Sequence, residues 1–160
     1  MTSRIQSCPE CGAVLGKPRS HSDHRRFFAM IAKAFDNWPH ENPFQPSSAE
    51  HLRAYLLVEA KYADATPVFV ELDCFPEAER QTALKLVSLT VEAAVAAALS
   101  QGAYAFVRVV GDTITVFRPR SINFATLGQR EFGPLREACE QIIEAALGVD
   151  IATLLQSRAA

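Results

Sequence analysis

The chain has 160 residues, of which 49% are hydrophobic and 21% are charged. A chain of this length and balance buries a real core, which excludes wholesale disorder. The formal net charge of −2 excludes a polybasic tail protein, although it permits a local basic patch.

The first residues contain no apolar targeting segment, because residues 1–6 are polar. The longest apolar run, residues 86–99, contains Glu92 and is too short to span a bilayer. We therefore expect a soluble cytoplasmic protein with no membrane partner.

Residues 1–19 form an amino-terminal extension with a Cys-x-x-Cys pair, and Ser20 opens the first predicted helix as its N-cap. Pro39 stops that helix. Residues on one side repeat at helical spacing, and we expect them to be buried together: Phe28, Ile31, Phe35 and Trp38. A proline-rich loop over residues 39–46 then leads to a second helix, which Ser47 caps.

The middle of the chain carries strand signals. Residues 68–72 predict a short strand, and Pro76 opens a long alanine-rich helix that ends near Gly102. The dipeptide Gly111-Asp112 predicts a hairpin between strands over residues 104–110 and 113–118. Counting outward from this turn pairs residue 108 with residue 115.

The last part of the chain is helical again. A helix is predicted over residues 130–147 and is closed by Gly148, and Asp150 caps a short final helix. The order of helices, then strands, then helices predicts an α+β fold rather than a doubly wound sheet. We expect a small antiparallel sheet with a hairpin, packed by about four helices, in a single domain over residues 20–160.

The alanine-rich helix is apolar on nearly all sides. Such a helix is buried either in the core or at a contact between copies of the chain. A homo-oligomer is therefore an open expectation.

Four residues near the amino terminus have the chemistry of a zinc site. Cys8 and Cys11 form a knuckle, and His21 and His24 lie three residues apart, so both imidazoles share one helix face. Together they make a Cys₂His₂ set, and four ligands are what structural zinc needs. The alternative is two free thiols and two solvent-exposed histidines.

Basic residues surround the start of the first helix: Lys17, Arg19, His21, His24, Arg25 and Arg26. Free amides and the helix dipole favour an anion there, and the hydroxyl of Ser20 adds a donor. Phe27 and Phe28 follow, and charge beside rings suits single-stranded nucleic acid, which offers phosphates and bases. The alternatives are a solvated basic face and two core phenylalanines.

A second basic cluster lies at the predicted hairpin and just after it, in Arg108, Arg118, Arg120 and Ser121. These residues either contact phosphate or protect an edge strand by charge. We expect the two basic clusters to form one site.

No sequence motif indicates catalysis. The chain lacks a Gly-rich phosphate loop, a His-Glu-x-x-His motif and a Gly-x-Ser-x-Gly motif. We therefore expect a binding protein and not an enzyme.

Two segments carry a family resemblance. Arg19-Ser20, His24, Phe27-Phe28-Ala29 and the run over residues 34–39 resemble an uncharacterised family of phage and prophage proteins. So does the run Arg118-Pro119-Arg120-Ser121-Ile122-Asn123-Phe124-Ala125, followed by Phe132. In that family the second motif reads approximately Pro, basic, Ser-Ile-Ser-Phe, and here Asn123 stands at the second serine. The Arg-Ser start of the first helix is also similar to the NinB family of recombination mediators, which bind single-stranded DNA.

The resemblance implies a viral protein from phage recombination or replication gene regions, and it does not include the Cys-x-x-Cys extension. Together with the basic clusters it predicts a nucleic-acid-binding accessory protein whose ligand is single-stranded DNA. The alternative is a protein–protein interaction module that inhibits or redirects a host complex such as a defence effector. Its aromatic anchors would be Trp38 and Phe44 in the proline-rich loop.

Overall fold

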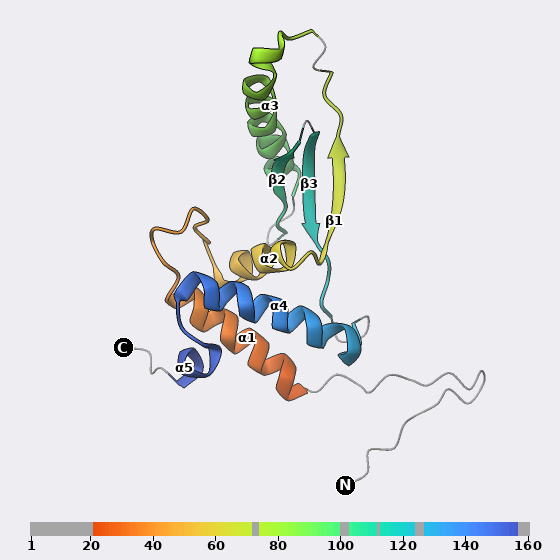
Figure 1. Ribbon diagram of the computed structural model, residues 1–160. Helices are drawn as coiled ribbons and strands as arrows, with labels where there is room; N and C mark the ends of the chain where they lie inside the picture. Colours follow the sequence, from red (N-terminus) through yellow and green to blue (C-terminus); the bar gives the residue numbers. More distant parts are fainter. Residues whose placement is uncertain (1–20, 72–73, 100–102, 112, 124–126, 157–160) are drawn as a thin grey trace, which may run out of the picture. The chain divides into compact units, whose positions relative to one another are not determined.

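The computed structural model describes residues 21–71, 74–99, 103–111, 113–123 and 127–156 (Figure 1). These residues form five helices and a three-stranded antiparallel sheet, so the predicted α+β class is confirmed. The elements follow one another as α1 (His21–Asp36), α2 (Ala49–Glu59), β1 (Ala63–Val68), α3 (Glu77–Ala98), β2 (Phe106–Val110), β3 (Thr113–Pro119), α4 (Gln129–Leu147) and α5 (Ile151–Gln156).

The chain divides into two compact units. The helical unit combines the residues up to Leu52 with those from Ser121 onward, and the sheet unit contains Arg53–Arg120. The first turn of α2 belongs to the helical unit and the rest of α2 to the sheet unit.

The core of the helical unit lies between α1, α4 and α5, which pack against one another. The ring of Phe27 on α1 meets the ring of Phe132 on α4 edge to face, with centroids 5.4 Å apart. Cys139 and Ile143 on α4 and Leu154 on α5 are also buried.

The buried face of α1 differs from the predicted one. Ile31 and Trp38 are buried as expected, but Phe28 and Phe35 are only half-buried. The remaining core positions on this helix are Phe27, Met30 and Ala34. Each step along a helix turns the side chain by about 100°, so the core face is centred one residue earlier than the sequence pattern suggested.

Capping residues fix the ends of the helices. The hydroxyl of Ser48, and not that of Ser47, accepts the backbone N–H of His51 at 3.0 Å, so Ser48 caps α2 and the predicted cap was one residue early. Gly148 closes α4 in a left-handed conformation with φ 69°, as predicted. Asp150 accepts the N–H of Thr153 at 2.9 Å and caps α5.

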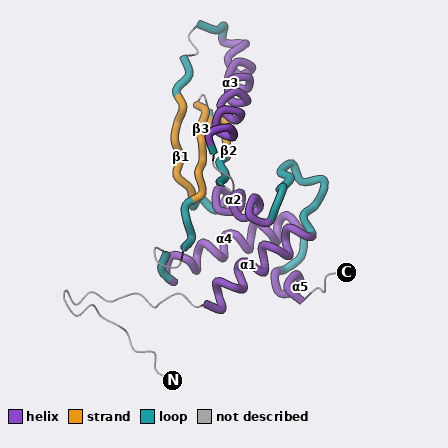
Figure 2. Tube along the Cα trace, turned by 180° about the vertical axis from the view of Figure 1, so that it is seen from behind, coloured by secondary structure: helices purple, strands orange, loops and turns teal. Residues whose placement is uncertain are grey.

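The sheet has the strand order β1-β3-β2, and both neighbouring pairs are antiparallel. In the predicted hairpin Arg108 pairs with Thr115, as expected, and Gly111 adopts a left-handed φ of 61°. Ile114 and Val116 point to the same side of β3 and are buried. Helix α3 packs against β2 and β3, and Figures 1 and 2 show it running alongside the sheet from opposite viewpoints.

The first strand lies earlier in the chain than predicted. β1 spans Ala63–Val68, so it shares only Val68 with the predicted strand over residues 68–72, and Phe69 is 88% exposed. β1 is an edge strand that pairs with β3 from Ala63 opposite Pro119 to Val68 opposite Ile114. Its position is set by this pairing, which local strand propensity does not report.

Candidate nucleic-acid interface

The predicted basic residues are distributed over both units. Arg25 and Arg26 lie on α1 in the helical unit, whereas Arg108, Arg118 and Arg120 lie in the sheet unit. Ser121 is the first residue of the second segment of the helical unit. Lys17, Arg19, Ser20, Cys8 and Cys11 lie outside the described residues. The expectation that both clusters form one site therefore stays a prediction.

The first turns of α1 present charge and an aromatic ring together. Arg25 and Arg26 are exposed, and neither forms an ion pair with another described residue. The ring of His24 lies 4.7 Å from the ring of Phe28, centroid to centroid. Phe27 belongs to the core, so of these two phenylalanines only Phe28 reaches the surface.

The start of α4 lies beside the start of α1. Gln129 donates from its side-chain amide to Asp23 Oδ2 at 3.2 Å, and Arg136 lies 4.0 Å from the other oxygen of that carboxylate. Both views show the amino-terminal ends of α1 and α4 at the same end of the helical unit (Figures 1 and 2). Two helix dipoles therefore present their positive ends together, and the carboxylate of Asp23 is one anion that they stabilise there.

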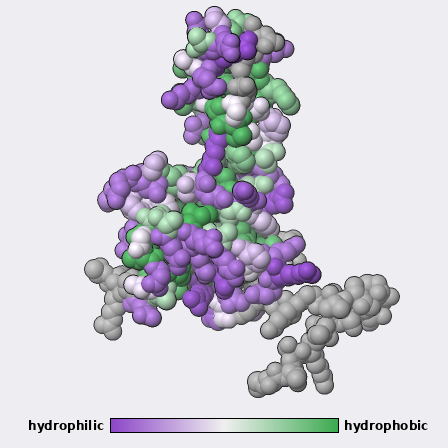
Figure 3. Space-filling model, viewed as in Figure 1, coloured by the Kyte–Doolittle hydropathy of each residue, from purple (hydrophilic) through white to green (hydrophobic). Residues whose placement is uncertain are grey.

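Arg130 is exposed in the first turn of α4 and adds a positive charge outside the two basic clusters of the sequence. Its position directly after the helix start was the available signal. Figure 3 shows that hydrophilic residues predominate on the visible face of the helical unit. The first two turns of α1 and the first turn of α4 together carry the exposed Arg25, Arg26 and Arg130 and the acidic Asp23 and Glu131.

A smaller basic cluster lies at the end of β3. Asp64 stands opposite Arg118 in the register of the sheet, and it accepts from Nε of Arg120 at 2.8 Å. The guanidinium of Arg120 also lies 6.0 Å from the ring centroid of Tyr62. Arg118 is exposed and forms no ion pair with a described residue, so two guanidinium groups and one carboxylate leave an excess positive charge.

Arg108 has a different environment from the other arginines of this cluster. Its guanidinium forms an ion pair with Glu59 on α2 and lies 5.9 Å from the ring centroid of Phe117. Burial raises the pKa of the neighbouring Tyr55, Glu59 raises it further, and the positive charge of Arg108 opposes both effects. The charge of Arg108 is thus neutralised by Glu59 and stabilises the sheet unit.

The two proposed aromatic anchors hold the proline-rich loop in place. Trp38 is 7% exposed, and its Nε1–H donates to the carbonyl oxygen of Phe44 at 2.8 Å. The Phe44 ring is half-buried and packs edge to face on His51, with centroids 5.0 Å apart. Trp38 therefore offers no exposed ring to a partner.

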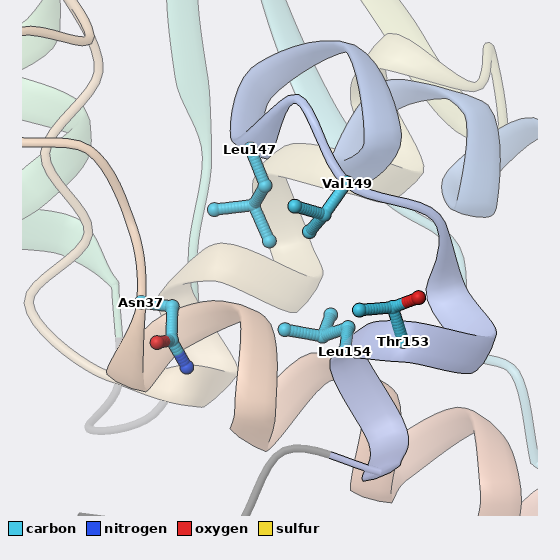
Figure 4. Close-up of a pocket in the computed structure, with 5 residues that line it drawn as sticks. All are labelled: Asn37, Leu147, Val149, Thr153 and Leu154. Carbon is cyan, nitrogen blue, oxygen red and sulfur yellow. The ribbon is translucent and has the colours of Figure 1, made fainter.

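A pocket of about 310 Å³ opens in the helical unit between the ends of α1 and α4 and the helix α5 (Figure 4). Its wall is largely aliphatic, and the lining residues are Asn37, Leu147, Val149, Thr153 and Leu154. None of these five side chains is an acid or a base, and the one hydroxyl among them, that of Thr153, donates to Asp150 Oδ2 at 2.7 Å.

The described ranges contain no group of three or more His, Cys, Asp or Glu side chains that could hold a metal. His21 and His24 lie on the first turns of α1, and their proposed partners Cys8 and Cys11 are outside these ranges. The zinc set therefore stays a prediction. Among the same described residues, no helix is long and apolar enough to cross a membrane.

No family model, no curated protein and no solved structure matches this chain. An assignment of function therefore rests on the chemistry of its own residues.

Proposed function

We propose that the protein binds nucleic acid, with single-stranded DNA as its ligand, and that it acts as an accessory factor in recombination or replication. The observation that carries the proposal is the first part of α1, where the exposed Arg25 and Arg26 follow His24, whose ring is in tilted contact with the ring of Phe28. The proposed chemistry is binding without turnover.

The proposed preference for single-stranded over duplex DNA follows from the exposed part of the Phe28 ring. Guanidinium groups contact the phosphates of either single-stranded or duplex DNA, so charge alone does not distinguish them. A surface ring stacks on a base only where the base is unpaired and accessible. Phe28 is half-buried, which leaves part of its ring at the surface next to the arginines.

The positive ends of the helices support the same ligand. The amino-terminal ends of α1 and α4 lie at the same end of the helical unit. Arg25 and Arg26 are exposed in the first two turns of α1, and Arg130 is exposed in the first turn of α4. Backbone amides at helix starts bind phosphate oxygens well, and the dipole adds to the attraction. A phosphate chain crossing this end of the helical unit would meet both kinds of donor.

Salt-dependent binding of a fluorescent oligonucleotide to the full chain tests the proposal. We expect the affinity for a single strand of about 20 nucleotides to fall steeply between about 50 and 200 mM salt. Replacing both Arg25 and Arg26 by alanine should weaken binding and reduce the salt slope by about two contacts. Circular dichroism of the double variant should stay unchanged, because both side chains are exposed.

Lys33→Ala is the matched control, since it removes one positive charge from the last turn of the same helix. It should change the affinity far less than the double variant does. Binding that is independent of salt, or that is equal in the double variant and the wild type, would contradict the proposal. Tighter binding to duplex than to single-stranded DNA would contradict the proposal that single-stranded DNA is the ligand.

A further inference from the structure

Helix α3 buries one side in its own unit and exposes an apolar side. Ala83 and Leu84 are buried, and the helix packs against β2 and β3. On another side Leu86 and Leu89 are 63% and 59% exposed. Figure 3 shows hydrophobic residues at the surface of the sheet unit. A contiguous exposed apolar surface of this kind marks an interaction site.

The spacing of the exposed residues specifies a helical partner. Leu86, Leu89, Ala93 and Ala96 are all exposed and follow one another at intervals of three, four and three residues. Alternation of three and four keeps the side chains on one line along the helix, as in the a and d positions of a heptad. Such a line packs against a second helix at a small crossing angle.

Two opposite charges flank this line. Lys85 and Glu92 are both exposed, and because they are seven residues apart they lie on the same side of it. Within the described part of the chain neither forms an ion pair. They are separated by about 10 Å along the helix, which is too far for them to pair with each other.

We propose that the occupant of this surface is α3 of a second copy of the chain, packed antiparallel about a two-fold axis near Ser88. The pair Leu86 and Leu89 and the pair Lys85 and Glu92 are both centred between Val87 and Leu89. Antiparallel packing therefore brings Leu86 against Leu89 of the second copy and Lys85 near Glu92 of the second copy. The two-fold axis repeats each contact.

The charges select this direction over the parallel one. In a parallel pair with the same leucines in contact, Lys85 would lie about 10 Å along the axis from Glu92 of the second copy. No opposite charges would then meet across the interface. Because only the antiparallel pair brings both the leucines and the opposite charges together, the part of the surface around Ser88 fits a second copy of itself. In this register Ala93 and Ala96 lie opposite Thr82 and Glu79 of the second copy. This inference does not depend on nucleic-acid binding.

Sedimentation of the full chain over a range of concentrations up to about 100 μM tests the proposal. We expect a monomer–dimer equilibrium that Leu86→Ser with Leu89→Ser abolishes. Both leucines are exposed in the single chain, so the variant should keep its circular dichroism spectrum. Leu84 is buried in the sheet unit and is not a suitable target, because its replacement would also unfold the unit.

Charge exchange tests the register. Lys85→Glu and Glu92→Lys should each raise the dimer dissociation constant by roughly tenfold, since each turns two attractive pairs into two repulsive ones. The double exchange K85E/E92K should restore the wild-type constant. A zero-length cross-link between Lys85 and Glu92 should also form between chains of different isotope label.

A chain that stays monomeric at the highest concentration overturns the proposal. A dimer that survives replacement of both leucines assigns the contact to another surface. If the double exchange K85E/E92K weakens the dimer by the sum of the two single effects, and does not restore the wild-type dissociation constant, the antiparallel register is wrong.

Discussion

Phe27 and Phe28 are neighbours in the chain with different environments. Phe27 is buried against Phe132, whereas Phe28 is half-buried beside His24. Phe27→Ala should lower the free energy of unfolding by about 3–5 kcal/mol, because it leaves a cavity in the core. Phe28→Ala should cost less than about 1.5 kcal/mol but should weaken single-stranded DNA binding by the loss of a stacked ring.

Urea unfolding measures the stability of both variants, and oligonucleotide binding measures their affinity for single-stranded DNA. A larger loss of stability at Phe28 than at Phe27 would show that the core face of α1 is the one the sequence pattern suggested. Unchanged DNA binding in the folded Phe28→Ala protein would remove the ring from the proposed interface.

Cys139 and Cys74 should differ in reactivity, because one is buried and the other is exposed. Burial, together with the carboxylate of Glu140, raises the pKa of the Cys139 thiol to about 12, whereas Cys74 is exposed. Because the thiolate is the nucleophile, a thiol reagent at about pH 8 should modify Cys74 quickly and Cys139 only after unfolding. Peptide mapping by mass spectrometry reads both sites, and equal labelling rates in the folded protein would contradict the expected burial.

The raised pKa of Cys139 also makes the free energy of unfolding depend on pH. The folded state holds the Cys139 proton more tightly than the unfolded state, whose thiol titrates near its ordinary value of 9.0. The contribution of this residue is therefore complete below about pH 9 and is lost as the pH rises toward 12.

At the scale of the element, the start of α2 depends on one hydroxyl. Ser48 Oγ accepts the N–H of His51, whereas Ser47 Oγ contacts only the imidazole of that residue. Ser48→Ala should lower the free energy of unfolding by about 1 kcal/mol, the usual contribution of an N-cap. Ser47→Ala is the control and should cost clearly less in the same thermal or urea unfolding measurement. A reversed order would place the cap at Ser47.

Element boundaries were predictable where a residue enforces them locally. Pro76 precedes α3, Gly148 closes α4, and Gly111 turns between β2 and β3, each at the position the sequence indicated. β1 was not predictable, because residues 63–68 include Pro67 and have weak strand propensity. The apolar residues just after it satisfied the strand pattern, yet the hydrogen bonds that define β1 come from β3, about fifty residues later.

The candidate site was predictable only as a set of basic residues. The sequence selected Arg25, Arg26, Arg118 and Arg120 but gave no means of separating them from Arg108. Glu59, which neutralises Arg108, is distant in the sequence, and the two residues meet only because the end of α2 and β2 fold together in the sheet unit. Likewise, the start of α4, which carries Arg130, contacts α1 through Gln129 and Asp23, which are far apart in the sequence.

At the scale of the whole molecule, the zinc prediction concerns the amino-terminal extension and the first turn of α1. We expect about one zinc ion per untagged chain, held by Cys8, Cys11, His21 and His24. Replacing Cys8 and Cys11 together by serine should abolish zinc binding in elemental analysis, whereas Cys74→Ser should leave it unchanged. Less than about 0.2 zinc per chain, with no loss of folding in a chelator, would exclude a structural zinc.

A second prediction for the whole molecule is that one strand of DNA contacts both basic clusters. If one strand of DNA contacts both, Arg19→Ala and Arg120→Ala should each weaken binding and each reduce the salt slope by about one contact. Neither change should cost much stability, since Arg120 is exposed and its pair with Asp64 lies at the surface. If Arg120→Ala binds a short oligonucleotide as tightly as the wild type does, the two basic clusters belong to different sites.

The strand order also sets the timing of folding during synthesis. β1 and β2 have no hydrogen bonds to each other, because each pairs only with β3, which is the last strand of the sheet to be made. At about 5–20 residues per second, a ribosome needs roughly 3–10 s to extend the chain from Val68 to Pro119. During that interval β1 has no strand to pair with, and α3 is synthesised before β3, against which it packs. The three-stranded sheet therefore forms only after β3 has been synthesised, and not strand by strand as the chain grows.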